Sequence, residues 1–141
     1  MRLVTWNLNH KTRAKAIPPS LIDAVASLEP DLIALTEYVH GDSRRPFLAQ
    51  LADRGLPYWH VSRVTPPGEN HVLIASRTPI ELGPIEAPAI APSVPSNALH
   101  VILPGEGTEI LGLRVPDYSK QRRLKRACWN WIIETAKTVK R

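Results

Sequence analysis

The most informative residues carry side-chain oxygens and stand where two apolar segments end. Asn7 and Asn9 follow the short apolar start of the chain, and Glu37 follows the apolar run Asp31–Thr36. Proteins hold a hard divalent cation such as Mg²⁺ through one or two carboxylates, together with water and substrate phosphate oxygens. If the two segments form neighbouring buried strands, Asn7, Asn9 and Glu37 converge on one point and can share a cation.

Two strands and two helices are expected to position these residues. Arg2–Leu8 is expected to be a strand. Pro18 and Pro19 open an amphipathic helix that Pro30 ends. Asp31–Thr36 is a continuous apolar run, as is typical of a strand covered on both faces. A second amphipathic helix is expected from about Arg45 to Arg54.

The rest of the chain alternates strand candidates with turn signals and ends in a helical pattern. The stretch Pro84–Pro95 holds four prolines and is either a loop or a proline-broken edge strand. From Ser119 onward apolar residues recur at helical spacing, with basic residues on the other face. The expected strands are Tyr58–Val64, His71–Arg77, Ile80–Ile85, Leu99–Leu103 and Glu109–Val115. This order predicts an α+β chain of the α/β sandwich type, with a mixed sheet and helices on its outer face.

Composition places the chain among soluble globular domains. Its 141 residues suit one domain, with 43% hydrophobic and 22% charged residues. Charges, Pro or Gly break every apolar run before spanning length, so no membrane segment is expected, and residues 1–8 do not resemble a secretory signal. Cys128 is the single cysteine, which excludes an internal disulfide and favours a cytoplasmic location.

The net charge of +5 is concentrated at one end of the chain. Residues 119–141 contain eight Lys or Arg and one acid, a net +7, whereas the remaining residues carry −2. Two interpretations stay open, a polyanion partner and a solvated helix face. Under the first interpretation Lys120, Arg122 and Arg123 are candidates for binding phosphate or nucleic acid.

Four segments in this order resemble the endonuclease/exonuclease/phosphatase superfamily, the metal-dependent phosphoesterases related to exonuclease III and the abasic-site endonucleases. These segments are Trp6–Asn9, Pro30–Glu37, Val72–Pro79 and Gly112–Pro116. Each motif alone is weak, but their order and spacing fit the N-terminal part of that family. The resemblance implies half of a four-layer sandwich and a Mg²⁺ or Mn²⁺ cofactor.

The resemblance also implies roles for individual residues. Asn7 matches an asparagine that helps to hold the metal-bound phosphate region, and Asn9 matches a position that is often acidic and near the metal. Glu37 matches the glutamate that ligates Mg²⁺. Arg114 falls where members commonly place His or Tyr near the scissile phosphate, and a guanidinium can clamp phosphate but cannot donate a proton. Arg77 and Arg114 are expected to offset phosphate charge.

Two later motifs of the family do not occur in this chain. The Asp-x-Asn segment positions the attacking water, and the His of a terminal Asp-His pair contacts the phosphate; neither is present. Residues 1–141 are therefore expected to be a single truncated domain whose activity is impaired. The first hypothesis is the N-terminal portion of a phosphodiesterase, acting on nucleic acid or another phosphoester. The alternative is a non-catalytic fragment that self-associates or binds polyanions.

Three further expectations concern packing. Each half of the full family fold is expected to supply one sheet, so this half would expose an apolar sheet face and form a homo-oligomer or bind a complementary C-terminal half. Trp6, Trp129 and Trp131 are expected in the core, whereas Trp59 can be a base-stacking platform. The five histidines are expected to be surface or strand-packing residues.

Overall fold

A computed structural model describes residues 1–9, 17–63, 68–91, 94–115 and 121–138. The predicted helices and strands are present, most of them shorter than expected at their ends. The segment Pro84–Pro95 is a loop in its described part up to Val94, because its prolines interrupt the N–H groups that a strand ladder needs, and Pro95 begins a short 3-10 helix, Pro95–Asn97. The elements are β1 (Leu3–Asn7), α1 (Pro19–Ala26), β2 (Leu32–Tyr38), α2 (Arg45–Asp53), β3 (Tyr58–Val61), β4 (His71–Ser76), β5 (Glu81–Leu82), β6 (Ala98–Leu103), β7 (Thr108–Leu113) and α3 (Arg122–Thr138).

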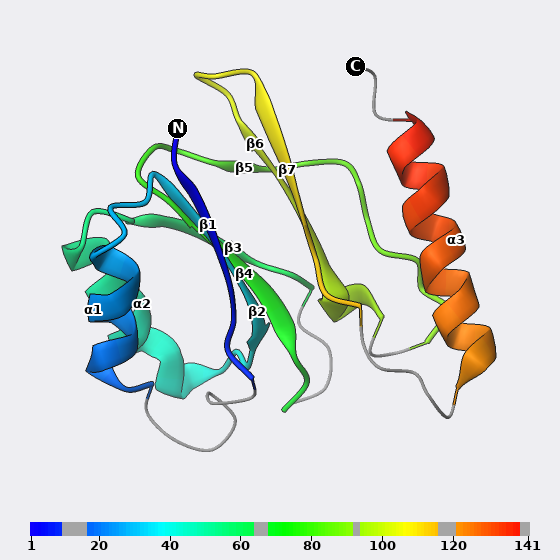
Figure 1. The fold of residues 1–141 in the computed structure, drawn as a ribbon, viewed down its shortest axis with the longest axis horizontal. Helices are drawn as coiled ribbons and strands as arrows, with labels where there is room; N and C mark the ends of the chain where they lie inside the picture. The colour runs from blue at the N-terminus through cyan, green and yellow to red at the C-terminus, as the bar shows by residue number, and fades with distance from the viewer. Residues whose placement is uncertain (10–16, 64–67, 92–93, 116–120, 139–141) are drawn as a thin grey trace.

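These elements form four layers (Figure 1). Helices α1 and α2 cover one face of a four-stranded sheet with strand order β1-β2-β4-β3. A second sheet, with order β5-β6-β7, follows, and α3 lies on its outer side. The first sheet is mixed, since β1 runs parallel to β2 and β2 runs antiparallel to β4. The predicted α+β class, with a mixed sheet and outer helices, is confirmed.

Strands β2 and β4 are the central strands of the first sheet and are buried on both faces. Alternate side chains point in opposite directions along a strand, so each strand feeds two clusters. Ile33, Leu35, Leu73 and Ala75 pack with α1 and α2. Leu32, Ala34, Val72 and Ile74 pack with residues of the second sheet.

The expectation that this half exposes a bare apolar sheet face is wrong. Leu99, Val101 and Leu103 of β6 are buried in the same cluster as the inward side chains of β2 and β4. Both sheets therefore come from this chain and cover each other. Hydrophobic periodicity shows that a strand is buried but does not show which segment covers it.

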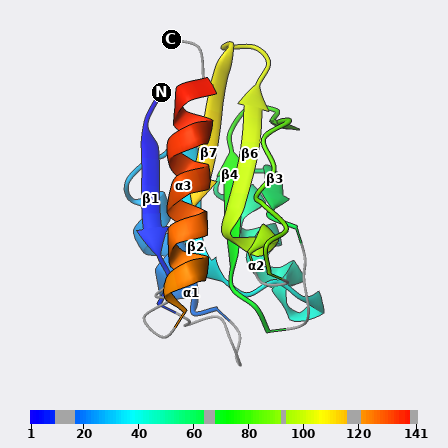
Figure 2. The ribbon, with the colours of Figure 1, turned by 90° about the vertical axis from the view of Figure 1, so that its right-hand side faces the viewer.

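The uncovered part of the sandwich is one of its edges, where the edge strands β1 and β7 lie, and not the face of a sheet. Strand β7 contacts β2 and β4, whereas β6 contacts β4 and β3. The two edge strands β1 and β7 therefore lie toward the same side, which Figure 2 also shows. On β1, the side chains of Leu3 and Trp6 are 47% and 39% exposed. An edge strand with exposed apolar side chains is a template for pairing with further strands.

Two of the tryptophans predicted in the core are exposed. Trp6 is exposed because β1 is an edge strand, with no further strand on its outer side in the described part of the chain. Trp129 is 45% exposed, since it lies one residue after buried Cys128 and therefore about 100° around α3 from the inward stripe. Trp131 is half-buried. Cys128 is buried. Among the described residues, no helix is both long and apolar enough to cross a membrane.

His100 is a strand-packing histidine whose ring is fixed from two sides. Its Nε2 lies 3.0 Å from Glu109 Oε2, and its Nδ1 accepts a hydrogen bond of 3.2 Å from the backbone N–H of Ile85. Only glycine fits beside this ring, since a Cβ built on Gly83 would lie 2.0 Å from His100 Nδ1.

Gly83→Ala is expected to destabilise the chain by about 1–3 kcal/mol, because the buried ring or the β5 backbone must move. Urea unfolding measures this effect. Gly105→Ala is the control, since no heavy atom lies within 4 Å of its Cβ position. In the background of His100→Ala the cost of Gly83→Ala should shrink; an unchanged cost would contradict the proposed clash.

Candidate functional site

Asn7 and Glu37 lie at the ends of two adjacent parallel strands. The register pairs Asn7 with Thr36, and the backbone N–H of Leu8 donates a 2.9 Å hydrogen bond to the carbonyl of Thr36. Carboxyl ends of parallel strands meet at one edge of a sheet. The structure therefore brings together the two segments that the sequence analysis singled out.

A β-bulge turns the Glu37 side chain toward the second sheet. The ladder between β2 and β4 is irregular between Thr36 and Tyr38, and Glu37 has a φ of 59°. Regular alternation would point Glu37 toward the helices, as Ile33 and Leu35 do. Instead its carboxylate contacts Arg114, which follows β7 of the second sheet. A left-handed glutamate is strained, and such strain commonly marks a functional position.

Arg114 is held between Glu37 and Asn97. Its Nε lies 3.5 Å from Glu37 Oε1, and both side chains are 15% exposed. Its Nη1 donates a 3.0 Å hydrogen bond to Asn97 Oδ1, and its backbone N–H donates to the Asn97 carbonyl at 2.8 Å. Among the described residues, no acceptor forms a hydrogen bond with the buried Nε. The ion pair therefore joins the two sheets through charge, without a hydrogen bond at Nε.

Asn7 and Asn9 form a tight turn at the end of β1. The backbone N–H of Asn9 donates a 2.7 Å hydrogen bond to Asn7 Oδ1, and Asn9 has a φ of 47°, which asparagine tolerates better than most residues. Both residues are exposed. The turn directs the Asn7 amide back toward its own backbone, and its oxygen keeps a second lone pair for another partner.

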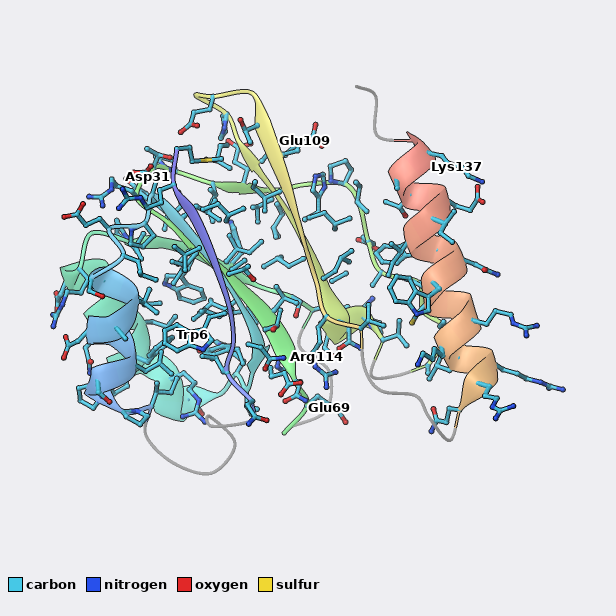
Figure 3. All side chains as sticks on the ribbon, viewed as in Figure 1. Trp6, Asp31, Glu69, Glu109, Arg114 and Lys137 are labelled. Carbon is cyan, nitrogen blue, oxygen red and sulfur yellow. The ribbon has the colours of Figure 1, made fainter. Side chains whose placement is uncertain are left out.

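Several polar residues at the same end of the first sheet were not singled out from the sequence. Asn97 is 6% exposed and anchors Arg114. Glu69 and buried Asn70 precede β4, whose first residue pairs with Tyr38, and Figure 3 shows Glu69 and Arg114 at this end. Asn97 and Asn70 each stand directly beside an apolar run. The same position beside an apolar run identified Asn7 and Glu37, and it could have identified Asn97 and Asn70 too.

Arg77 lies at the opposite end of the first sheet. Its backbone N–H donates to the Asp31 carbonyl at 2.8 Å, and its Nε lies 3.5 Å from Asp31 Oδ1. Figure 3 shows Asp31 far along the sheet from Arg114. The pKa of Asp31 is lowered, mainly by the hydrogen bond from the backbone N–H of Arg2 and further by nearby positive charges. Arg77 and Arg114 therefore do not share a site.

The remaining basic candidates belong to α3 or lie outside the described residues. Arg122 and Arg123 occupy the first turn of α3 and are exposed. Lys120 lies outside the described residues. The exposed side of α3 also carries Lys125 and Arg126. Because α3 covers the outer side of the second sheet, these cations are separate from the Glu37–Arg114 pair (Figure 3).

Three aromatic side chains pack behind the bulge, on the helix side of the sheet. His40 Nδ1 lies 3.4 Å from the Tyr38 hydroxyl, and the His40 backbone N–H lies 3.5 Å from His71 Nδ1. Burial raises the pKa of Tyr38 well above its usual value. Burial also lowers the pKa of His40 and His71, and Arg44 lowers that of His40 further. Both histidines are therefore packed as neutral rings.

Acid is expected to destabilise the chain through His71. Because its pKa is lower in the folded state, the unfolded chain binds the proton first as the pH falls. The stabilisation is complete above the ordinary histidine pKa of 6.5 and is lost as the pH falls through the lower pKa of the folded state. Urea midpoints between pH 5 and 7.5 measure this. The slope should flatten in His71→Leu; an identical slope in both proteins would contradict it.

The donor set at this end of the sheet fits a hard divalent cation. Glu37 offers a carboxylate and Asn7 an amide oxygen, and Mg²⁺ commonly takes only one or two carboxylates and keeps several waters. Within the described ranges, no group of three or more His, Cys, Asp or Glu is placed to hold a metal ion.

Comparison with known proteins supports this picture of the fold. The chain superposes on an AP endonuclease from Archaeoglobus fulgidus with a TM-score of 0.69 at 17% identity, covering 98% of this chain and 51% of that one. It superposes on the 3′ phosphatase NExo from Neisseria, solved with a product DNA hairpin, with a TM-score of 0.64 at 21% identity, covering 93% and 49%. The chain thus spans about half the length of these structures.

No curated protein matches the chain. The model of the endonuclease/exonuclease/phosphatase family matches residues 4–137, which include the ends of β1 and β2 and the position of Arg114. This match covers nearly the whole chain, and the superposed structures share its fold. The chain therefore belongs to the endonuclease/exonuclease/phosphatase family.

Proposed function

We propose that this chain is the N-terminal portion of a Mg²⁺- or Mn²⁺-dependent phosphoesterase that hydrolyses phosphodiester bonds in nucleic acid. The observation that carries the proposal is the bulge at Glu37, which directs a strained carboxylate toward Arg114 of the second sheet. Family membership supports phosphoester chemistry. The solved AP endonuclease and the phosphatase bound to a DNA hairpin support nucleic acid as the substrate class.

Each residue has a separate task in this proposal. Glu37 and Asn7, with Asn9 beside them, would hold the cation. The cation would neutralise the negative charge that develops on the phosphate during hydrolysis. Arg114 would hold a phosphate oxygen through its guanidinium, since it is always charged and presents several N–H donors. Asn97 would orient Arg114 through the 3.0 Å hydrogen bond to Nη1.

The residues that activate water must come from elsewhere, because the chain contains neither an Asp-x-Asn nor an Asp-His sequence. The proposal therefore treats residues 1–141 as one truncated domain, impaired when alone. The test is hydrolysis of a phosphodiester and of an abasic-site duplex with Mg²⁺. The chain is assayed alone and mixed with the C-terminal half of the Neisseria enzyme. Activity that EDTA removes supports the proposal; no hydrolysis in both assays, of the chain alone and of the mixture, rejects it.

We also propose that another polypeptide segment covers the edge of β1, either a complementary C-terminal half or a second copy of the chain. The support is the open side of the sandwich, where Leu3 and Trp6 are exposed. Sedimentation velocity over a hundredfold concentration range is expected to show self-association. A monomer mass at every concentration would contradict pairing with a second copy.

A second candidate function is a polyanion-binding module without catalysis. It is favoured by the outward side of α3, which carries four exposed cations beside exposed Trp129. The cations are Arg122, Arg123, Lys125 and Arg126. Binding through backbone phosphates would weaken steeply with salt. Salt-sensitive DNA binding that survives both EDTA and Glu37→Gln, without any hydrolysis, would favour this function over the first.

A further inference from the structure

We propose that Arg114 is a built-in competitor for the Glu37 carboxylate, so that a divalent cation and a phosphate group bind this end of the sandwich cooperatively. Each ligand takes one partner of the Glu37–Arg114 ion pair: the cation takes the carboxylate, and the phosphate takes the guanidinium. The inference rests on the proposed function, because it concerns the same cation site.

The geometry of the Glu37–Arg114 ion pair favours the replacement of each partner by a ligand. Arg114 Nε lies 3.5 Å from Glu37 Oε1, and this buried nitrogen has no hydrogen-bond acceptor among the residues that the structure describes. Buried polar groups are nearly always hydrogen-bonded, so an unsatisfied guanidinium N–H needs an explanation. A phosphate oxygen would satisfy this donor, since Arg and phosphate form short charge-assisted hydrogen bonds. Asn97 holds only the Nη1 end of the guanidinium and leaves Nε toward Glu37.

Burial strengthens the electrostatic interaction between Glu37 and Arg114. The Arg77–Asp31 pair has the same separation, 3.5 Å, but its side chains are 51% and 45% exposed. The side chains of Glu37 and Arg114 are each 15% exposed. Water screens the first pair, whereas the second pair is largely removed from water. Arg77 and Asp31 therefore provide a matched control at the opposite end of the same sheet.

The cation and the phosphate bind cooperatively because each ligand alone leaves one partner of the ion pair without its opposite charge. A cation alone on Glu37 faces the unneutralised guanidinium of Arg114 at close range. A phosphate alone on Arg114 adds negative charge beside the Glu37 carboxylate. When both ligands bind, the cation lies beside the Glu37 carboxylate and the phosphate beside the Arg114 guanidinium. Neither of these two electrostatic repulsions then opposes binding. The two affinities must then rise by the same factor, which for coupled sites is typically about 5- to 150-fold.

The test measures the binding of Mn²⁺ to the whole chain, using the EPR signal of free Mn²⁺ to determine how much stays unbound. The measurement is made with and without dimethyl phosphate, which serves as the phosphate probe. Wild-type chain is expected to bind Mn²⁺ about fivefold or more tightly when dimethyl phosphate is present. Arg114→Gln is expected to bind Mn²⁺ more tightly without the probe and to lose the enhancement. Arg77→Gln should behave as wild type in both measurements.

Arg114→Lys keeps the positive charge and is expected to keep weak Mn²⁺ binding in the absence of the probe. Mn²⁺ binding that Glu37→Gln abolishes, but that neither dimethyl phosphate nor Arg114→Gln changes, overturns the competitor role and leaves the proposed function standing. No Mn²⁺ binding with or without the probe overturns both. The wild-type comparison decides the matter even where Arg114→Gln does not fold.

Discussion

Glu37→Gln is expected to lower divalent-cation-dependent hydrolysis by roughly 10²- to 10³-fold, because a bound cation contributes several kcal/mol of charge stabilisation and each 1.4 kcal/mol is about tenfold in rate. Glutamine has nearly the shape of glutamate and keeps an oxygen near Arg114, but it lacks the charge that holds the cation. The measurement is the initial rate of phosphodiester hydrolysis against Mg²⁺ concentration, with the complementing C-terminal half present.

Asp31→Asn is the matched control for this change. It removes one carboxylate charge just before β2, at the opposite end of that strand from Glu37, where Asp31 pairs with Arg77. It should leave the rate within about twofold of wild type, since surface ion pairs contribute little. Equal losses in the two variants would point to general charge or folding effects and would contradict the cation role of Glu37.

Ile74→Ala is expected to destabilise the chain by about 2–5 kcal/mol, the largest stability effect predicted for a single side chain here. Ile74 lies on central strand β4, is fully buried between the two sheets, and approaches Gly112 of β7 so closely that a Cβ there would lie 3.2 Å from Ile74 Cδ1. Truncation would leave a cavity between sheets that cannot easily collapse. Urea unfolding followed by tryptophan fluorescence measures the loss.

Leu82→Ala is the control, because it removes the same number of carbon atoms from a side chain that is 62% exposed. Its effect should stay within about 0.5 kcal/mol. This comparison tests the four-layer arrangement directly. If Ile74→Ala and Leu82→Ala cost the same, the two sheets do not cover each other as the structure has them.

The layer assignment also explains which packing prediction failed. The apolar runs of β2 and β4 correctly indicated strands covered on both faces. The sequence did not reveal which segment covers the second face of β2 and β4, since β6 is separated from β4 by more than twenty residues of chain. Pairings of this kind depend on tertiary packing, and the period of a single segment carries no trace of them. The consequence is an open edge at β1 in place of an open face.

The site shows the same division. That Asn7 and Glu37 lie near the ends of two strands could be predicted from the sequence, because polar oxygens directly after apolar runs mark strand ends, although β2 continues through Glu37 to Tyr38. That Glu37 points toward Arg114 could not, since a β-bulge shifts a side chain by one position and has no sequence signature as simple as the turn residues have. Arg77 stood in a motif of the same kind as Arg114, yet it lies at the far end of the sheet.

The amino-acid sequence alone determined the strands, the helices and the family, because residue type and period report local conformation and burial, and the cation chemistry of the site stays a prediction. Only the tertiary structure decided that Arg114 meets Glu37, that Asn97 holds Arg114, and that Arg77 pairs with Asp31 elsewhere. The physical reason is that strand register, bulge position and sheet stacking are set by contacts between segments far apart in the chain. Residue spacing within one segment does not encode those contacts.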